Sequence, residues 1–328
     1  MIRNRCVSLS VTFLSMIFFG ASGTDYWSQV FAEELSPSEI IATVDGEPVY
    51  VGELNLILAE RFQGQPIDSI DADLKRATCH VLAQRRLALR ALRKAGGESL
   101  VRMVQAEVDA FAAEVKRRGS TLQQQAAARS SDTASLIVDL TWRVAWGAYL
   151  KSKLTDSNLR RFFESNASAY DGTRYRVSQI FMRPISTSPG HIEETIKSLS
   201  AIASEIQTSE DRAGSFTVAA RTHSQSATAE AGGELGWIES EGDLPAGLVR
   251  ELRRLPIGSV SQPLRSPVGV HLLFIQEVEK GSKTFDDLID VTLLRRDAAN
   301  AMFQTLVESQ SETKVMWHLD VLKPPATR

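Results

Sequence analysis

The stretch that most constrains this fold is residues 215–237, which reads SFTVAARTHSQSATAEAGGELGW. It begins with apolar residues at helical spacing, passes through small polar residues and ends in GGELGW. Three glycines around a glutamate and a leucine predict a tight turn with positive φ, followed by a short strand. Such a turn alone is compatible with many folds, so its flanking segments decide what it means.

Three flanking segments stand in order around this turn. Residues 175–182 (YRVSQIFM) precede it and have the composition of a strand. Residues 255–263 (LPIGSVSQP) and 266–275 (SPVGVHLLFI) follow it. The ordered set, over roughly residues 173–281, resembles the parvulin (rotamase) family of peptidyl-prolyl cis-trans isomerases. The resemblance implies a small antiparallel sheet wrapped by helices, which isomerises X-Pro peptide bonds without a cofactor.

The resemblance also implies which residues form the site. Its polar, catalytic positions fall on Gln179, Ser226 and His271. Its substrate-binding positions fall on apolar residues, namely Leu244, Leu248, Phe181 and Trp237. We expect the pocket that contains Leu248 to be open to solvent, so that a charge placed there would leave the fold largely intact.

Two of these positions depart from the family pattern. The family has a histidine at the position of Gln179 and an acidic residue or cysteine at the position of Ser226. Glutamine and serine can keep a hydrogen-bonded network, but they cannot place a negative charge beside the substrate amide. His271 is open to two interpretations, a direct role in the reaction or a structural role that ties two strands together.

Composition limits the class of protein. The 328-residue chain has room for about two domains, and its 43% hydrophobic and 23% charged residues are typical of globular proteins. A net charge of −3 does not favour nucleic-acid binding, which usually needs a clustered basic surface. The five histidines show no metal-ligand spacing, so we expect no metal and no other cofactor. Of the two cysteines, Cys79 lies among apolar helical residues and is interpreted as a buried structural thiol.

Residues 1–23 have the pattern of an export signal. Arg3 and Arg5 precede a 14-residue apolar run, and small residues follow it. The run is shorter than the ~20 residues that a spanning helix needs, so it predicts a cleaved signal peptide and a periplasmic or otherwise extracytoplasmic protein. The alternative is an uncleaved N-terminal anchor that would associate the protein with a membrane.

Residues 36–165 are predicted to form a helical domain that begins with a hairpin over residues 40–50. The hairpin has an Asp-Gly turn, and Pro48 requires its second strand to lie at an edge. The predicted helices begin at Val51 and then cover about residues 71–94 (ended by a Gly-Gly pair), 100–118, 134–154 and 159–165.

Two features of these helices invite a functional interpretation. A basic stripe on the second helix is interpreted as a solvated helix face; its residues are Arg85, Arg86, Arg90, Arg93 and Lys94. The helix over residues 134–154 is rich in aromatic residues, including Trp142, Trp146 and Tyr149. These side chains either line a groove for apolar peptide or pack against neighbouring helices.

Residues 284–328 are predicted to return to the N-terminal domain. Periodicity predicts a helix over 285–309, and alternation predicts a strand over 314–322 that pairs with the hairpin. The unit at 173–281 is then an insertion, and the chain an α+β protein. The hairpin segment IIATVDGEPVY…ELNLIL resembles the start of SurA/PrsA-like exported foldases, where it precedes a helical chaperone domain.

Three hypotheses about function follow. The first is an exported foldase that isomerises X-Pro bonds in unfolded or extended polypeptides and assists the folding of secreted proteins. The second is a catalytically weak or inactive parvulin-fold chaperone that binds extended apolar peptide. The third is an accessory protein of an export system. Gln179 and Ser226 favour the second and third, whereas His271 and the apolar pocket favour the first, which we prefer.

Overall fold

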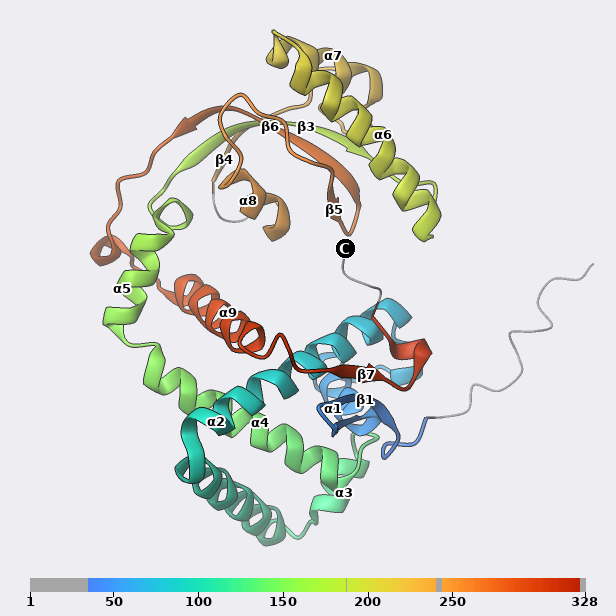
Figure 1. Cartoon of the computed structure of the whole chain (residues 1–328), viewed down its shortest axis with the longest axis vertical. Helices are drawn as coiled ribbons and strands as arrows, with labels where there is room; N and C mark the ends of the chain where they lie inside the picture. The colour runs from blue at the N-terminus through green and yellow to red at the C-terminus, as the bar shows by residue number, and fades with distance from the viewer. Residues whose placement is uncertain (1–34, 187, 240–243, 325–328) are drawn as a thin grey trace, which may run out of the picture.

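The computed structural model describes residues 35–186, 188–239 and 244–324. Figure 1 shows a helical part with a small sheet at one end of the molecule and a larger sheet covered by helices at the other, joined along one side. The predicted signal segment, residues 1–23, lies outside the described residues. No helix of the described residues is long and apolar enough to cross a membrane.

The helical part takes in both ends of the described chain. Its N-terminal elements are β1 (Ile40–Val44), β2 (Glu47–Tyr50), α1 (Val51–Arg61), η1 (Ile67–Ser69), α2 (Ala72–Arg117), α3 (Leu122–Ala127), α4 (Thr133–Lys153), α5 (Asp156–Ser165) and η2 (Ala167–Ala169). Its C-terminal elements are η3 (Phe285–Asp287), α9 (Thr292–Glu308), β7 (Val315–Trp317) and η4 (Asp320–Leu322).

The predicted hairpin and its C-terminal partner strand are both present. Asp45 and Gly46 have φ values of 51° and 83°, as a two-residue hairpin turn requires. The strand order is β2-β1-β7, so Pro48 lies in an edge strand. Ala42 pairs with Trp317, which confirms that the chain leaves the helical part and returns to it.

The C-terminal helix and strand are shorter than predicted. The predicted helix over 285–309 is wrong at its start, because Thr284 and Asp287 cap a single turn and Asp290 accepts from the backbone of Thr292, where α9 begins. The predicted strand over 314–322 ends at Trp317. The chain then turns so that Leu322 is buried against the core.

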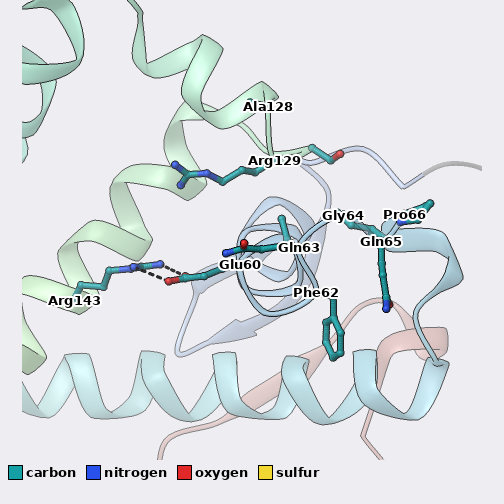
Figure 2. A pocket seen from close by; sticks show the side chains of 12 residues that line it. Glu60, Phe62, Gln63, Gly64, Gln65, Pro66, Ala128, Arg129 and Arg143 are labelled. Atoms are coloured by element: carbon teal, nitrogen blue, oxygen red, sulfur yellow. Dashed lines mark hydrogen bonds and ion pairs between the residues drawn. The ribbon is translucent and has the colours of Figure 1, made fainter. Parts of the chain in front are cut away.

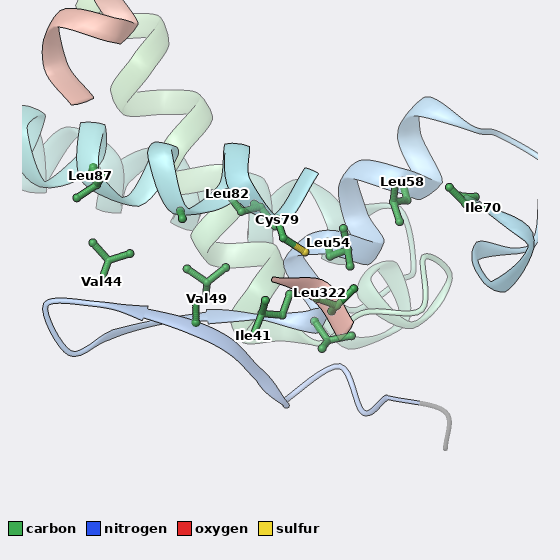
Figure 3. Packing of buried hydrophobic residues seen from close by; sticks show 13 residues of the cluster. Ile41, Val44, Val49, Leu54, Leu58, Ile70, Cys79, Leu82, Leu87 and Leu322 are labelled. Carbon is green, nitrogen blue, oxygen red and sulfur yellow. The ribbon is translucent and has the colours of Figure 1, made fainter. Parts of the chain in front are cut away.

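The main core of the helical part lies between the hairpin, α1, the first half of α2 and η4 (Figure 3). Cys79 is fully buried there, as predicted, and burial raises the pKa of its thiol to about 12. A thiol with so high a pKa is not a nucleophile near neutral pH. The two helices predicted on either side of the glycine pair meet at a kink at Gly97, which has φ 52° and ψ −148°.

The prediction that the basic stripe on α2 is a solvated face is wrong for Arg86 and holds for Arg93 and Lys94, which are exposed. Arg86 is buried and its Nη2 lies 2.6 Å from Glu53 Oε1 of α1, which is also buried. Three neighbours pair with acidic residues of other elements: Arg85 with Asp139, Arg90 with Asp45, and Arg93 with Glu47. The stripe thus joins α2 to the hairpin, α1 and α4, because each of these elements supplies a carboxylate to it.

The aromatic residues of α4 pack against a neighbouring helix. Trp142 and Trp146 stack on each other at 5.5 Å between ring centroids, and Tyr149 continues the stack. Phe303 of α9 meets both tryptophans edge-on. Of the two alternatives for these residues, packing is confirmed.

The inserted part contains an antiparallel sheet of strand order β4-β3-β6-β5. Its elements are β3 (Arg174–Met182), α6 (Pro189–Thr208), α7 (Arg212–His223), β4 (Glu234–Glu239), α8 (Ala246–Leu252), β5 (Leu264–Ser266) and β6 (Gly269–Glu279). Helices α6 and α7 pack on one face of the sheet and α8 packs on the other. The expected α+β fold with an inserted, helix-wrapped sheet is confirmed.

The glycine turn is built as its sequence predicts. Gly232 and Gly233 have φ values of 74° and 80°, and β4 follows at once. A Cβ at Gly233 would lie 2.2 Å from the carbonyl oxygen of Gln179. The backbone N–H of Gln179 also donates to Gly233 O at 2.8 Å. Only glycine permits this approach, which holds the turn against β3 beside one of the predicted site residues.

Candidate functional site

The site residues are brought together by the pairing of the two central strands, β3 and β6. His271 pairs with Phe181, and Gln179 pairs with Leu273 two residues away. Alternate residues of a strand share a face, so Gln179, Phe181 and His271 all point to the face that α8 covers. Their even-numbered neighbours point to the α6–α7 face.

Hydrogen bonds connect the three predicted polar residues. Gln179 Nε2 donates to Ser226 Oγ at 3.2 Å, and Gln179 Oε1 lies 3.3 Å from His271 Nδ1. Ser226 Oγ also contacts Thr228 Oγ1 at 3.1 Å. The structure therefore assembles Gln179, Ser226 and His271 into one network.

Ser266 completes this network and is a site residue that was not predicted from the sequence. Its Oγ lies 2.7 Å from His271 Nε2, the shortest of these contacts. Ser266 and Gly269 pair across the two-residue turn between β5 and β6. This short turn in the sequence SPVGVH was the available signal, because it returns Ser266 to the same face and close to His271.

Each hydrogen bond of His271 can be assigned one donor and one acceptor. The amide oxygen of Gln179 can only accept, so His271 Nδ1 donates to it. A neutral imidazole then accepts at Nε2, where the Ser266 hydroxyl donates. His271 is 5% exposed, and burial lowers the pKa of its ring, which favours this neutral form.

The predicted apolar residues differ in how they relate to the network. The ring of Phe181 is half-buried and lies 5.0 Å from that of His271. Leu244, which precedes α8, is half-buried and packs against the α8-side core. Leu248 is only 1% exposed and packs inside the α8-side core. The expectation that Leu248 faces an open pocket is wrong, because its side chain is buried. A charge introduced at this position should therefore destabilise the domain and would not leave the fold intact.

The structure does not bring Trp237 to the other site residues. Its neighbour Ile238 packs into the α8-side core, so the Trp237 ring points away from that core along the edge strand β4. The ring is 38% exposed, and the Arg174 guanidinium lies 5.4 Å from its centroid.

Comparison with known proteins identifies the inserted part. Residues 180–277 match the Rotamase family, described as the PPIC-type PPIase domain. The chain carries a PpiC-type rotamase domain. The matched range contains Ser226, Ser266 and His271, and Gln179 lies one residue before it. The match confirms the resemblance to the parvulin family.

The chain is also similar to SurA chaperones. It is 30% identical to the chaperone SurA of Burkholderia orbicola over 123 residues, which cover 37% of this chain and 27% of that protein. It is 28% identical to the chaperone SurA of Cupriavidus metallidurans over 245 residues, which cover 70% of this chain and 48% of that protein. The chain spans about half the length of these curated relatives or less.

The chain was also compared with solved structures, and one match is to a chaperone. A SurA-like chaperone structure from Campylobacter jejuni is 17% identical, and the match covers 84% of this chain and 96% of that chain with a TM-score of 0.29.

The network of the rotamase domain has limited chemistry. His271 is its only group that titrates near neutral pH; Gln179 contributes an amide, and Ser226, Ser266 and the neighbouring Thr228 contribute hydroxyls. Among the described residues, no cluster of histidine, cysteine or acidic side chains is arranged to hold a metal ion. The site can therefore donate and accept hydrogen bonds beside an apolar ring, but it presents no fixed negative charge of its own.

Proposed function

We propose that this protein is an exported foldase that catalyses cis-trans isomerisation of X-Pro bonds in unfolded polypeptides. The observation that carries the proposal is the network of Gln179, Ser226, Ser266 and His271. Its last three members lie inside the matched rotamase range, and Gln179 immediately precedes that range. Phe181 and Leu244 supply apolar surface on the same face for a proline ring.

Isomerisation needs no nucleophile. The barrier to rotation about a peptide bond is ~20 kcal/mol and comes from amide resonance, which an apolar environment weakens. A site that removes water from the proline and donates a hydrogen bond to the twisted amide lowers that barrier. Phe181 supplies the apolar surface. The donors left for a substrate amide are the second N–H of Gln179 and the hydroxyl of Ser226, because the one N–H of a neutral His271 is already donated to Gln179.

The second candidate function is that of a chaperone or export accessory protein. Its rotamase domain would bind extended apolar peptide without catalysing isomerisation. The observation that favours it is the uncharged pair Gln179 and Ser226, joined at 3.2 Å. Neither residue places a negative charge near the amide. The similarity to SurA chaperones is compatible with either function.

The division into domains belongs to the same proposal. We assign residues 36–165 and 284–328 to a chaperone unit and residues 173–281 to the rotamase unit. The ends of the inserted unit lie side by side, because Arg174 pairs with Glu279 and Gly281 N donates to Thr173 Oγ1 at 3.0 Å. Replacing residues 173–281 by a short Gly/Ser linker should leave a soluble, helical remainder.

Export is supported by the apolar run in residues 1–23. In a bacterial host, the chain with its native start should be recovered outside the cytoplasm and shortened at its N-terminus. A full-length cytosolic product would contradict the export part of the proposal.

The decisive experiment measures isomerisation of a short X-Pro peptide by NMR exchange or a protease-coupled assay. The full chain should accelerate the reaction, and Phe181→Ala should slow it while peptide binding elsewhere persists. Phe181 is half-buried, so the variant should fold. A rate equal to the uncatalysed rate, with retained peptide binding, would favour the second candidate function.

A further inference from the structure

A cleft in the helical part, far along the chain from the rotamase domain, has the features of a second binding site. It measures about 610 Å³, which is within the usual range for ligand sites. The end of α1, the loop that follows it, the turn after α3 and one residue of α4 form its walls (Figure 2). Its apolar residues are Phe62, Pro66 and Ile67, and its uncharged polar ones include Gln63, Gln65 and Ser130.

The charged residues that line the cleft are two arginines and one glutamate. Arg143 donates to both carboxylate oxygens of Glu60, at 2.5 Å and 3.3 Å, and its Nε donates to Asp139 at 2.6 Å. These three contacts use three of the five N–H donors of a guanidinium. Figure 2 shows Arg143 and Arg129 on the side of α1 where Glu60 lies.

Arg129 is the cation of the cleft that has no acidic partner. None of the ion pairs among the described residues involves Arg129. The pKa of Glu60 is lowered, chiefly because Arg143 donates to it, and the charges of Arg129 and Arg85 act in the same direction. Arg129 is therefore close enough for its charge to be felt in the cleft, although no carboxylate of the described residues forms an ion pair with it.

The wall that carries Arg129 is held in an unfavourable backbone conformation. The next residue, Ser130, has φ 51°, which non-glycine residues rarely adopt. The buried amide of Asn55 donates to Ser130 O at 2.7 Å, and Ser131 Oγ donates to Gly52 O at 2.8 Å. These contacts from α1 hold the turn in place, so Arg129 is presented by a supported wall.

We propose that this cleft binds a carboxylate of an extended polypeptide, with Arg129 as the main contact. The net positive lining selects an anionic group, and the guanidinium matches a carboxylate in shape. The amides of Gln63 and Gln65 can hydrogen-bond the peptide backbone, and Phe62 and Pro66 can contact a neighbouring apolar side chain. The chain would thus favour acidic over neutral segments, whether or not its rotamase domain is active.

The test uses the full chain and short fluorescent peptides that contain no proline, so the rotamase site is not involved. The first peptide carries Glu-Phe-Glu and an amidated C-terminus, the second Gln-Phe-Gln with the same amide, and the third Gln-Phe-Gln with a free C-terminal carboxylate. We expect the first to bind about fivefold to tenfold more tightly than the second. The third shows whether a terminal carboxylate can replace a side-chain one.

Two variants with opposite expected effects on the preference for the acidic peptide make the test specific. Arg129→Gln should abolish the preference for the acidic peptide, whereas Glu60→Gln should strengthen it because a repelling charge is removed. The control is Arg102→Gln, which makes the same charge change on an exposed part of α2 away from the cleft. Equal affinities for the first two peptides, or equal effects of Arg129→Gln and Arg102→Gln, would overturn the proposal.

Discussion

The rotamase domain and the helical part satisfy their buried polar side chains differently, the first with neutral hydrogen bonds and the second with ion pairs. The rotamase domain joins Gln179, Ser226, Ser266 and His271 through neutral hydrogen bonds. The helical part buries charges instead, with Arg86 against Glu53 and Asp139 against two arginines. A buried charge that loses its partner costs far more than a neutral group that does. We therefore expect the loss of one partner to destabilise the helical part more than it destabilises the rotamase domain.

The largest expected effect comes from breaking the buried ion pair. Arg86→Met leaves the Glu53 carboxylate buried without its cation and should cost about 3–5 kcal/mol of unfolding free energy. The matched control is Arg90→Met, whose side chain is 42% exposed and which should cost about 1 kcal/mol or less. Urea unfolding measures both. Similar costs for the two variants would show that the buried pair does not hold α1 and α2 together.

The next effect concerns the apolar core beneath the rotamase site. Leu248→Ala removes a fully buried side chain of α8 and should cost about 3 kcal/mol of unfolding free energy. Leu244→Ala, at a half-buried position of the same cluster, should cost clearly less. Thermal unfolding of the two variants checks the order. If Leu248→Ala were the milder change, its place in the core would be wrong.

The third effect is expected when a charged residue is introduced into the neutral network. The double variant Gln179→His/Ser226→Asp restores the family residues and should raise the isomerisation rate about tenfold, equivalent to about 1.4 kcal/mol of transition-state stabilisation. Thr222→Asp places the same charge on the exposed surface of α7 and should leave the rate unchanged. If the wild-type protein does not catalyse isomerisation and the double variant does, the natural protein is a binding module.

A smaller effect is expected from pH. Burial lowers the pKa of His271 below its ordinary value of about 6.5. The unfolded chain therefore binds a proton more readily than the folded one in this range, so stability should fall as pH drops below about 6.5. His271→Gln, which cannot titrate, should show a flatter dependence of unfolding free energy on pH between about 5 and 7. An unchanged slope would contradict the buried neutral ring.

The smallest effect is predicted for Trp237. Its ring lies away from the network on an edge strand, so Trp237→Ala should cost about 0.5 kcal/mol or less and leave the isomerisation rate unchanged. Phe181→Ala, beside His271, is the comparison that should slow the reaction. A rate loss in Trp237→Ala equal to that in Phe181→Ala would place the tryptophan in the substrate site after all.

Local patterns in the sequence were sufficient for much of the architecture. The Asp-Gly hairpin, the edge position of Pro48 and the positive-φ turn at Gly232 and Gly233 all follow from backbone preferences of single residues. The order of motifs around that turn was also sufficient to indicate the rotamase domain and to place Gln179, Ser226 and His271 in it. These features depend on neighbours in the chain, which a sequence displays directly.

Partners that are distant in the chain were decided only by the tertiary structure. The arginines of α2 looked solvated because their carboxylates lie on the hairpin, α1 and α4, which the sequence does not place beside them. Leu248 looked like an exposed pocket residue because its burial depends on how α8 packs on the sheet. Arg129 became a candidate ligand-binding residue only once Asn55 was seen to hold its turn beside α1. Burial and charge pairing are properties of the assembled fold, and the one-dimensional pattern does not contain them.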